Sequence, residues 1–101
     1  MTTVMNVVNP EGNQPDDAAF ELMYRANLDE VFQYLLRHVN RNTEDAMELT
    51  GEVFVAALGK FRAGKGDEVT IAWLMTTARR RLIDRWRKLE VRDRNRELLR
   101  M

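Results

Sequence analysis

Apolar residues recur at helical spacing in three stretches of the chain, which short polar segments separate. The first stretch follows Asp16 and Asp17, which suit a helix N-terminus because they cap it and favour the positive end of its dipole. Its stripe comprises Phe20, Tyr24, Leu28, Val31, Leu35 and Val39. These steps of three and four predict one amphipathic helix that ends near Asn40, Arg41 and Asn42.

The second stretch begins at Thr43, a residue type that caps helices, with Glu44 and Asp45 in the expected first turn. Its apolar positions are Ala46, Leu49, Val53, Ala57 and Phe61, widened by Phe54 and Leu58. Residues 62–69 contain two glycines and a charge cluster, which interrupt any period. The pattern predicts a second helix followed by a loop.

The third stretch begins at Thr70, again a capping residue. Its stripe comprises Ile71, Leu74, Met75, Ala78, Leu82, Trp86 and Leu89, and we expect both Trp73 and Trp86 in the core. Residues 93–101 are highly charged and either fray or continue the helix. No segment has a strand pattern, so we expect an all-α fold, a compact three-helix bundle.

The length of 101 residues supports one domain. Residues 1–15 have no period and contain Asn-Pro and Glu-Gly-Asn, so we expect a flexible N-terminal tail. The helical domain is expected over residues 16–92, and residues 93–101 form a charged end or the start of an interdomain linker.

Several functional classes are disfavoured by composition. The chain has no cysteine, which excludes disulfides and thiolate metal sites and fits a cytoplasmic protein. No apolar run approaches the roughly 18 residues of a membrane span, and Met1 to Val8 lack the basic start of a signal peptide. The single histidine, His38, lies on a different helix from the acidic row described next. We therefore expect no enzyme activity, no metal and no cofactor.

The formal net charge of zero conceals a division of the chain into an acidic and a basic part. Residues 1–59 carry three cations and ten anions, a net −7, and residues 60–101 carry a net +7. This asymmetry indicates either two different partners, one basic and one polyanionic, or two halves that neutralise each other in the fold.

Candidate binding residues lie in both parts. Glu44, Glu48 and Glu52 form a row on the second helix, where each like-charge pair costs roughly 0.2–0.5 kcal/mol. The row is either a docking face for a basic helix or an ordinary solvated face. The third helix carries Arg79, Arg80, Arg81, Arg85, Arg87, Lys88 and Arg92. These cations suit a single-stranded nucleic acid, or they pair with the acidic half.

Three segments, in this order, resemble region 2 of extracytoplasmic-function (ECF) sigma factors, a subfamily of the sigma-70 family. The first helix contains Phe20-Glu-Leu-Met-Tyr-Arg25 and Val31-Phe-x-Tyr-Leu-Leu-Arg37. The second reads Glu44-Asp-Ala-x-Glu-Leu-Thr-x-Glu-Val-Phe-x-Ala-Ala-Leu58. The third reads Ala72-Trp-Leu-x-Thr-x-Ala-Arg-x-Arg-Leu-Ile-Asp-x-Trp-Arg87. The resemblance covers about residues 18–90.

The resemblance implies two partners for a domain that directs transcription initiation. The second helix would dock on the clamp coiled coil of the largest core RNA polymerase subunit, through Asp45, Glu48, Leu49, Glu52, Val53 and Phe54. The loop and third helix would bind the non-template single strand of the promoter −10 element and hold a flipped base. The residues carried over for DNA are Lys65, Gly66, Asp67, Glu68, Val69, Thr70, Thr76, Thr77, Arg80 and Arg81.

Two positions depart from the family pattern. Gly51 stands where many members have Gln, and Arg80 stands where many have Asn. Because nothing after Leu89 could form the family's second DNA-binding domain, region 4, we expect the chain to be a piece of a longer protein, the alternative being an unusual short protein. An anti-sigma factor is a further expected partner. The alternatives are an adaptor or decoy that binds polymerase or an anti-sigma factor without promoter melting, and a helical bundle with no nucleic-acid role.

Overall fold

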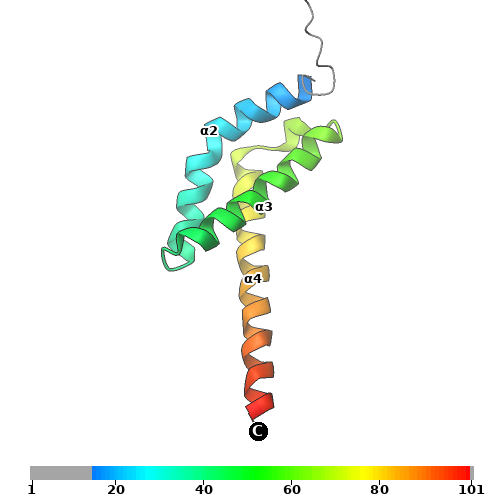
Figure 1. The fold of residues 1–101 in the computed structure, drawn as a ribbon. Coiled ribbons are helices and arrows are strands. Elements are labelled where there is room, and N and C mark those ends of the chain that lie inside the picture. The colour runs from blue at the N-terminus through cyan, green and yellow to red at the C-terminus, as the bar shows by residue number, and fades with distance from the viewer. Residues whose placement is uncertain (1–14, 101) are drawn as a thin grey trace, which may run out of the picture.

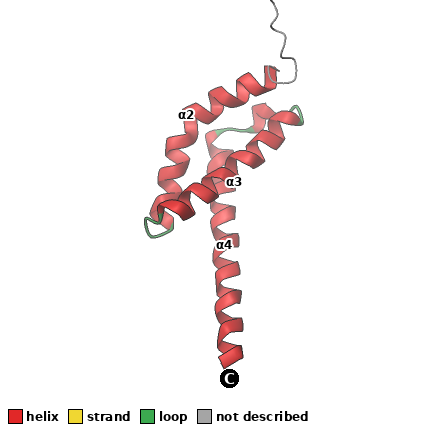
Figure 2. Ribbon diagram, viewed as in Figure 1, coloured by secondary structure: helices red, strands yellow, loops and turns green. Residues whose placement is uncertain are grey.

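The structure, a computed structural model, describes residues 15–100 and is built from three α-helices and one short 3-10 turn. In chain order these are α2 (Pro15–His38), α3 (Thr43–Arg62), η1 (Gly66–Glu68) and α4 (Ile71–Arg100). Figures 1 and 2 show α2 and α3 joined by a tight turn, with α4 crossing behind α3. The all-α, three-helix prediction is confirmed. The tail expected at residues 1–14 lies outside the described residues.

The core is formed by the three predicted stripes. Val31 and Leu35 of α2 are fully buried, and Phe20, Tyr24, Leu28 and Val39 pack partly buried around them. The buried apolar residues of α3 and α4 are Ala46, Leu49, Val53, Phe54, Ala57, Phe61, Leu74, Ala78 and Leu82. Edge-on aromatic contacts of Phe20 with Phe61 and of Tyr24 with Phe54 join α2 to α3. Burial of these stripes is the main contribution to the stability of the bundle.

The turn between α2 and α3 corrects one predicted cap. Asn42, and not Thr43, is the N-cap of α3, because its side-chain oxygen accepts a hydrogen bond from the Asp45 backbone N–H at 3.0 Å. Asn40 and Arg41 adopt positive φ angles of 59° and 61°, a conformation that an α-helix cannot continue through. The helix α2 therefore ends at His38, close to the predicted end. The Arg41 N–H donates to the Leu36 carbonyl at 3.1 Å, as in helix ends closed by a left-handed residue.

The connection from α3 to α4 is tightly structured. Gly64, with φ of 77°, closes α3, and the Lys65 N–H donates to the Lys60 carbonyl at 2.8 Å. The η1 turn follows. Thr70 then caps α4 as predicted, because its hydroxyl accepts a hydrogen bond from the Trp73 N–H at 3.1 Å.

The predicted core stripe of α4 is wrong at both ends. Ile71 is 39% exposed, Trp86 is 47% exposed and Leu89 is 41% exposed, whereas Leu82 is 1% exposed. Figure 1 gives the reason for the C-terminal end of the stripe, because α4 leaves the body formed by α2 and α3 and projects beyond it. The charged end does not fray but continues the helix to Arg100. The bundle is therefore compact only as far as the first half of α4.

Residues 15–100 contain neither a membrane-spanning helix nor a cluster of metal ligands. No helix within residues 15–100 is both long and apolar enough to cross a membrane. Over the same residues, no group of three or more histidine, cysteine, aspartate or glutamate side chains could hold a metal ion.

Candidate functional site

The solvent-facing side of α3 carries acidic and small residues. Glu44, Glu48 and Gly51 are exposed, and Val55 is 70% exposed. An added Cβ at Gly51 would meet no atom within 4 Å, so this position is open to solvent. These four positions recur at steps of three and four and form one outward face, which another helix can approach closely at Gly51.

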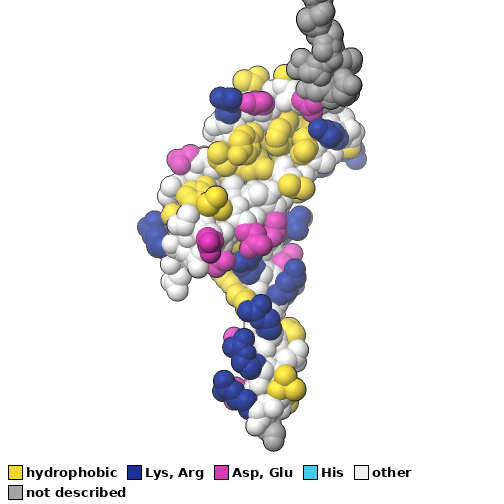
Figure 3. Space-filling model, in the orientation of Figure 1, with side chains coloured by type: hydrophobic (Ala, Val, Ile, Leu, Met, Phe, Trp, Pro, Cys, Tyr) yellow, Lys and Arg dark blue, Asp and Glu magenta, His cyan; other side chains and the backbone are white. Residues whose placement is uncertain are grey.

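The acidic side of α3 also contacts α4. Arg85 donates hydrogen bonds from its guanidinium to Asp45 at 2.9 Å and to Glu48. The hydrogen bond that Arg85 donates to Glu48 raises the pKa of Arg85 above its ordinary value. Figure 3 shows the acidic side chains in the middle of the body beside cations of α4. Part of the basic half therefore neutralises the acidic half within the fold, which is one of the two interpretations of the charge asymmetry.

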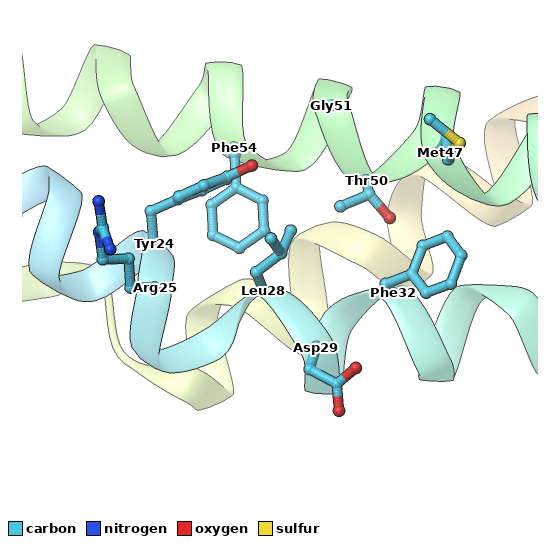
Figure 4. A pocket seen from close by; sticks show the side chains of 9 residues that line it. All are labelled: Tyr24, Arg25, Leu28, Asp29, Phe32, Met47, Thr50, Gly51 and Phe54. Carbon is cyan, nitrogen blue, oxygen red and sulfur yellow. The ribbon is translucent and has the colours of Figure 1, made fainter.

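The side of α3 that faces α2 borders an apolar groove. Figure 4 shows the groove between α2 and α3, with Tyr24 and Leu28 facing Phe54 and Thr50. Its volume is about 480 Å³. The lining residues are Tyr24, Arg25, Leu28, Asp29, Phe32, Met47, Thr50, Gly51 and Phe54. Gly51 borders both this groove and the outward face, so the two surfaces are continuous.

The loop before α4 is braced on the body. An added Cβ at Gly66 would lie 2.5 Å from the Phe61 ring, so the backbone passes directly over this side chain. Val69 is 8% exposed, and Lys60 forms an ion pair with Glu68. The hydrogen bond and the charge of Lys60 lower the pKa of Glu68. These contacts pack the predicted loop against the end of α3.

The outer surface of α4 near this loop combines hydroxyl groups and cations. Thr76 and Arg80 are exposed, whereas the Thr77 hydroxyl donates to the Trp73 carbonyl at 2.9 Å. Arg81 is half-buried and borders the polar groove between α3 and α4 with Glu48 and Glu52. Neighbouring arginines therefore have different surroundings, since Arg80 faces solvent and Arg81 faces carboxylates.

Most of this domain matches a known protein family. Residues 23–92 match the model of the family described as Sigma-70 region 2, and this span includes most of α2, all of α3 and η1, and most of α4. The chain belongs to the Sigma-70 region 2 family. No curated protein and no solved structure matches the chain significantly. Sigma region 2 is not an enzyme domain; it acts in transcription initiation and binds RNA polymerase and promoter DNA.

Within this region 2 domain, the structure divides the residues expected to bind polymerase into two groups. Asp45, Glu48 and Glu52 have accessible carboxylates on α3. Leu49, Val53 and Phe54 are 1%, 0% and 4% exposed, so they belong to the core and offer little surface to a partner in this conformation. Direct contact of these three residues with polymerase stays a prediction. Their role is to hold α3 against α2 and α4.

The residues expected to bind DNA are also not equivalent. Lys65, Asp67, Thr76 and Arg80 are exposed on the loop and α4. The others have internal partners or are buried: Gly66 packs on Phe61, Glu68 pairs with Lys60, Val69 is buried, Thr70 caps α4, Thr77 bonds its own helix and Arg81 faces α3. Val69 offers little surface to DNA in this conformation, and its direct contact with the strand stays a prediction.

Sequence reasoning missed two features of this region 2 domain. Arg85 was grouped with the general cations of α4, although it is the cation that bonds Asp45 and Glu48. Its signal was present, since Arg81, Arg85 and Lys88 recur at helical steps and match an acidic row of similar spacing. The groove between α2 and α3 had no such signal, because its width depends on how the two helices pack.

Proposed function

We propose that the chain is region 2 of an ECF-type sigma factor that docks on core RNA polymerase through α3 and binds the non-template strand of the promoter −10 element through η1 and α4. The ECF assignment rests on the three motif segments in their order along the chain. One observation carries the proposal: α3 and α4 leave accessible surfaces of opposite charge, Glu44 and Glu48 on one helix and Arg80 on the other. Such a body can join a basic protein helix and a polyanion at the same time.

The polymerase side of the proposal assigns α3 to the clamp coiled coil, a basic helical hairpin of the largest subunit. The carboxylates of Glu44, Glu48 and Glu52 supply charge complementarity, which favours the encounter and fixes the orientation of the complex. Beside these carboxylates, Gly51 leaves the helix backbone open to close approach and Val55 adds an exposed apolar side chain. Where many family members have Gln, Gly51 has no side chain that could donate or accept a hydrogen bond, so close approach of the backbone replaces a side-chain contact.

The DNA side of the proposal assigns the loop and the outer face of α4 to the unpaired strand. Flipping a base from its stack costs a few kcal/mol, which several contacts must offset together. The brace of Gly66 on Phe61 and the cap at Thr70 hold the loop in one conformation before DNA arrives. Lys65, Thr76 and Arg80 then present a cation, a hydroxyl and a guanidinium to the strand. A preformed loop lowers the ordering cost of binding.

The same assignment names a further partner and a compartment. An anti-sigma factor would cover the outward face of α3, the adjoining apolar groove or both, and would thereby block polymerase. Both surfaces meet at Gly51, so one inhibitor could cover them together. Because polymerase and promoter DNA occupy the bacterial cytoplasm, the proposed function places the chain there.

Docking is tested by the affinity of the chain for core polymerase, measured by fluorescence anisotropy. The double variant Glu48→Lys, Glu52→Lys should bind at least ten times more weakly, since like charges across an interface cost several kcal/mol. Glu30→Lys on α2 is the matched control, because Glu30 is exposed but lies outside the proposed face. Circular dichroism confirms that each variant remains helical. An unchanged affinity of the double variant would refute docking through α3.

Strand binding is tested by the salt dependence of the affinity of the polymerase-bound chain for a −10 single strand. Arg80→Ala should lower the slope of log K against log salt by about 0.7, the value for one phosphate contact on a single strand. Arg92→Ala, an exposed position three turns further along α4, is the matched control. If Arg80→Ala changes neither this slope nor the preferred sequence, Arg80 is not part of the interface.

A further inference from the structure

Arg85 lies beneath the carboxylates that α3 presents to solvent. Its side chain is 23% exposed, compared with 41% for Asp45 and 63% for Glu48. One guanidinium nitrogen donates to Asp45 Oδ1 at 2.9 Å and the other donates to Glu48 Oε1. Among residues 15–100, these are the ion pairs that join α4 to α3. The most enclosed group of this cluster is therefore a cation, and the more exposed groups are anions.

We propose that Arg85 is a positioning residue for polymerase docking: it fixes Asp45 and Glu48 in the arrangement that the partner's basic helix binds, and it does not contact DNA. This inference rests on the proposed function, because it assigns a role within the α3 docking face. It also removes one cation of α4 from the DNA surface. Arg85 thereby links the polymerase-binding helix to the DNA-binding helix.

The geometry favours positioning over competition with the partner. A carboxylate has about four lone-pair sites on its two oxygens, and Arg85 is bonded to one oxygen of Glu48. The remaining sites of Glu48 lie on the exposed side of the cluster, where a partner cation can bind without displacing Arg85. Displacing Arg85 would also break its bond to Asp45. The guanidinium fork is suited to bridging two carboxylates in a fixed geometry.

Positioning and simple charge attraction predict opposite effects of removing Arg85 on the affinity for polymerase. Immobilising a flexible side chain at an interface weakens binding by roughly two- to twelvefold, a cost that a side chain already held in place avoids. Removing Arg85 would restore that cost for Glu48 and would also leave two neighbouring carboxylates to repel each other. In contrast, charge attraction alone predicts tighter binding, since the acidic face would lose a cation.

The experiment measures the affinity of Arg85→Gln and Arg85→Lys for core polymerase by fluorescence anisotropy. We expect Arg85→Gln to bind about three to ten times more weakly, within the range for one or two released side chains. Arg85→Lys keeps the charge but not the fork, so it should also bind more weakly. Arg87→Gln is the matched control, since Arg87 is exposed on the same helix and makes no ion pair to α3. Arg85→Gln that binds as tightly as the parent, or more tightly, overturns the inference.

A double-mutant cycle separates positioning from a general loss of folding. In the Glu48→Gln background, Arg85→Gln should reduce polymerase affinity by less than half as much as it does in the parent chain. The reason is that Glu48, the partner that Arg85 positions, is already altered. Full additivity overturns the inference, since a purely structural loss would not depend on Glu48. If the parent chain itself fails to bind polymerase, the proposed function fails. If the parent binds and Glu48→Lys, Glu52→Lys weakens it, the Arg85 result tests this inference alone.

Discussion

The two halves of α4 carry the same apolar period but have different surroundings. In residues 71–82, Leu74, Ala78 and Leu82 are buried against α2 and α3. In residues 83–100, Trp86 and Leu89 continue the same stripe but are 47% and 41% exposed. Every residue from Trp86 to Arg100 is exposed. One continuous helix is therefore part of a packed body at its start and a projection at its end.

The difference teaches that an apolar period shows which face of a helix would be buried, but not where its partner ends. Beyond Arg85, which bonds α3, the projecting half depends on helix propensity and on surface ion pairs within the helix, such as Arg94 with Glu90 at 3.9 Å. Such pairs contribute little stability. The packed half instead holds Thr76 and Arg80 in place beside the braced loop. The proposed strand-binding residues thus lie on the rigid part of α4.

The largest expected effect is on the packed half. Leu82→Ala should lower the free energy of unfolding by about 2–5 kcal/mol, because it deletes a fully buried side chain and leaves a cavity. Leu89→Ala, two turns along the same stripe, should cost less than about 1 kcal/mol, because Leu89 is 41% exposed. Urea denaturation monitored by circular dichroism measures both values. Equal losses would show that the two halves of α4 are packed alike.

A smaller effect is expected at η1, the turn that leads into the packed half of α4. Gly66→Ala should destabilise the fold by about 1–3 kcal/mol, because the new Cβ would lie 2.5 Å from the buried Phe61 ring. Gly59→Ala is the matched control, since its Cβ meets no atom within 4 Å and alanine favours the helix by about 0.5–1 kcal/mol. The two glycine changes should therefore shift the thermal midpoint in opposite directions. A stabilising Gly66→Ala would show that the loop is not braced on Phe61.

The smallest expected effect concerns the ion pair of Lys60 with Glu68 at the same entry. Because Lys60 lowers the pKa of Glu68 below 4.5, the pair stabilises the fold at neutral pH. That contribution is lost as pH falls below about 4.5 and Glu68 becomes protonated in the folded state. Glu68→Gln should remove this part of the acid dependence of the thermal midpoint.

Glu97→Gln is the control for this pH profile, because Glu97 pairs with Arg100 on the projecting half, 3.9 Å away. It should leave the acid dependence of the body unchanged. The thermal midpoint is compared between pH 3 and pH 6, a range that spans the ordinary glutamate pKa of 4.5. If Glu68→Gln leaves the pH dependence of the midpoint unchanged over this range, the pair does not stabilise the loop.

Much of the fold could be predicted from sequence because it depends on local chemistry. The stripes of α2 and α3 and the cap at Thr70 follow from side-chain spacing and from hydrogen bonds within a few residues. The cap at Asn42 was misplaced by one residue, because Thr43 has a similar capping chemistry. The exposure of Trp86 could not be predicted, since it depends on where the body formed by α2 and α3 ends.

Less of the candidate site than of the fold could be predicted from the sequence. Motif order indicated α3 and the loop, but it did not distinguish the accessible Glu48 from the buried Leu49 and Val53. Helical periodicity would have separated them, since Leu49 and Val53 belong to the core stripe. The pairing of Arg85 with Asp45 required the crossing of α3 and α4, which is a tertiary property.

The most direct test of the central claim is strand selection by the chain bound to core polymerase. A pool of single-stranded DNA with a randomised segment the length of a −10 element is incubated with the complex, and retained strands are sequenced. Our account predicts enrichment of one short sequence over scrambled strands, and a changed or weakened enrichment with Arg80→Ala. Polymerase binding without enrichment of any sequence would contradict promoter recognition and would favour an adaptor of the same fold.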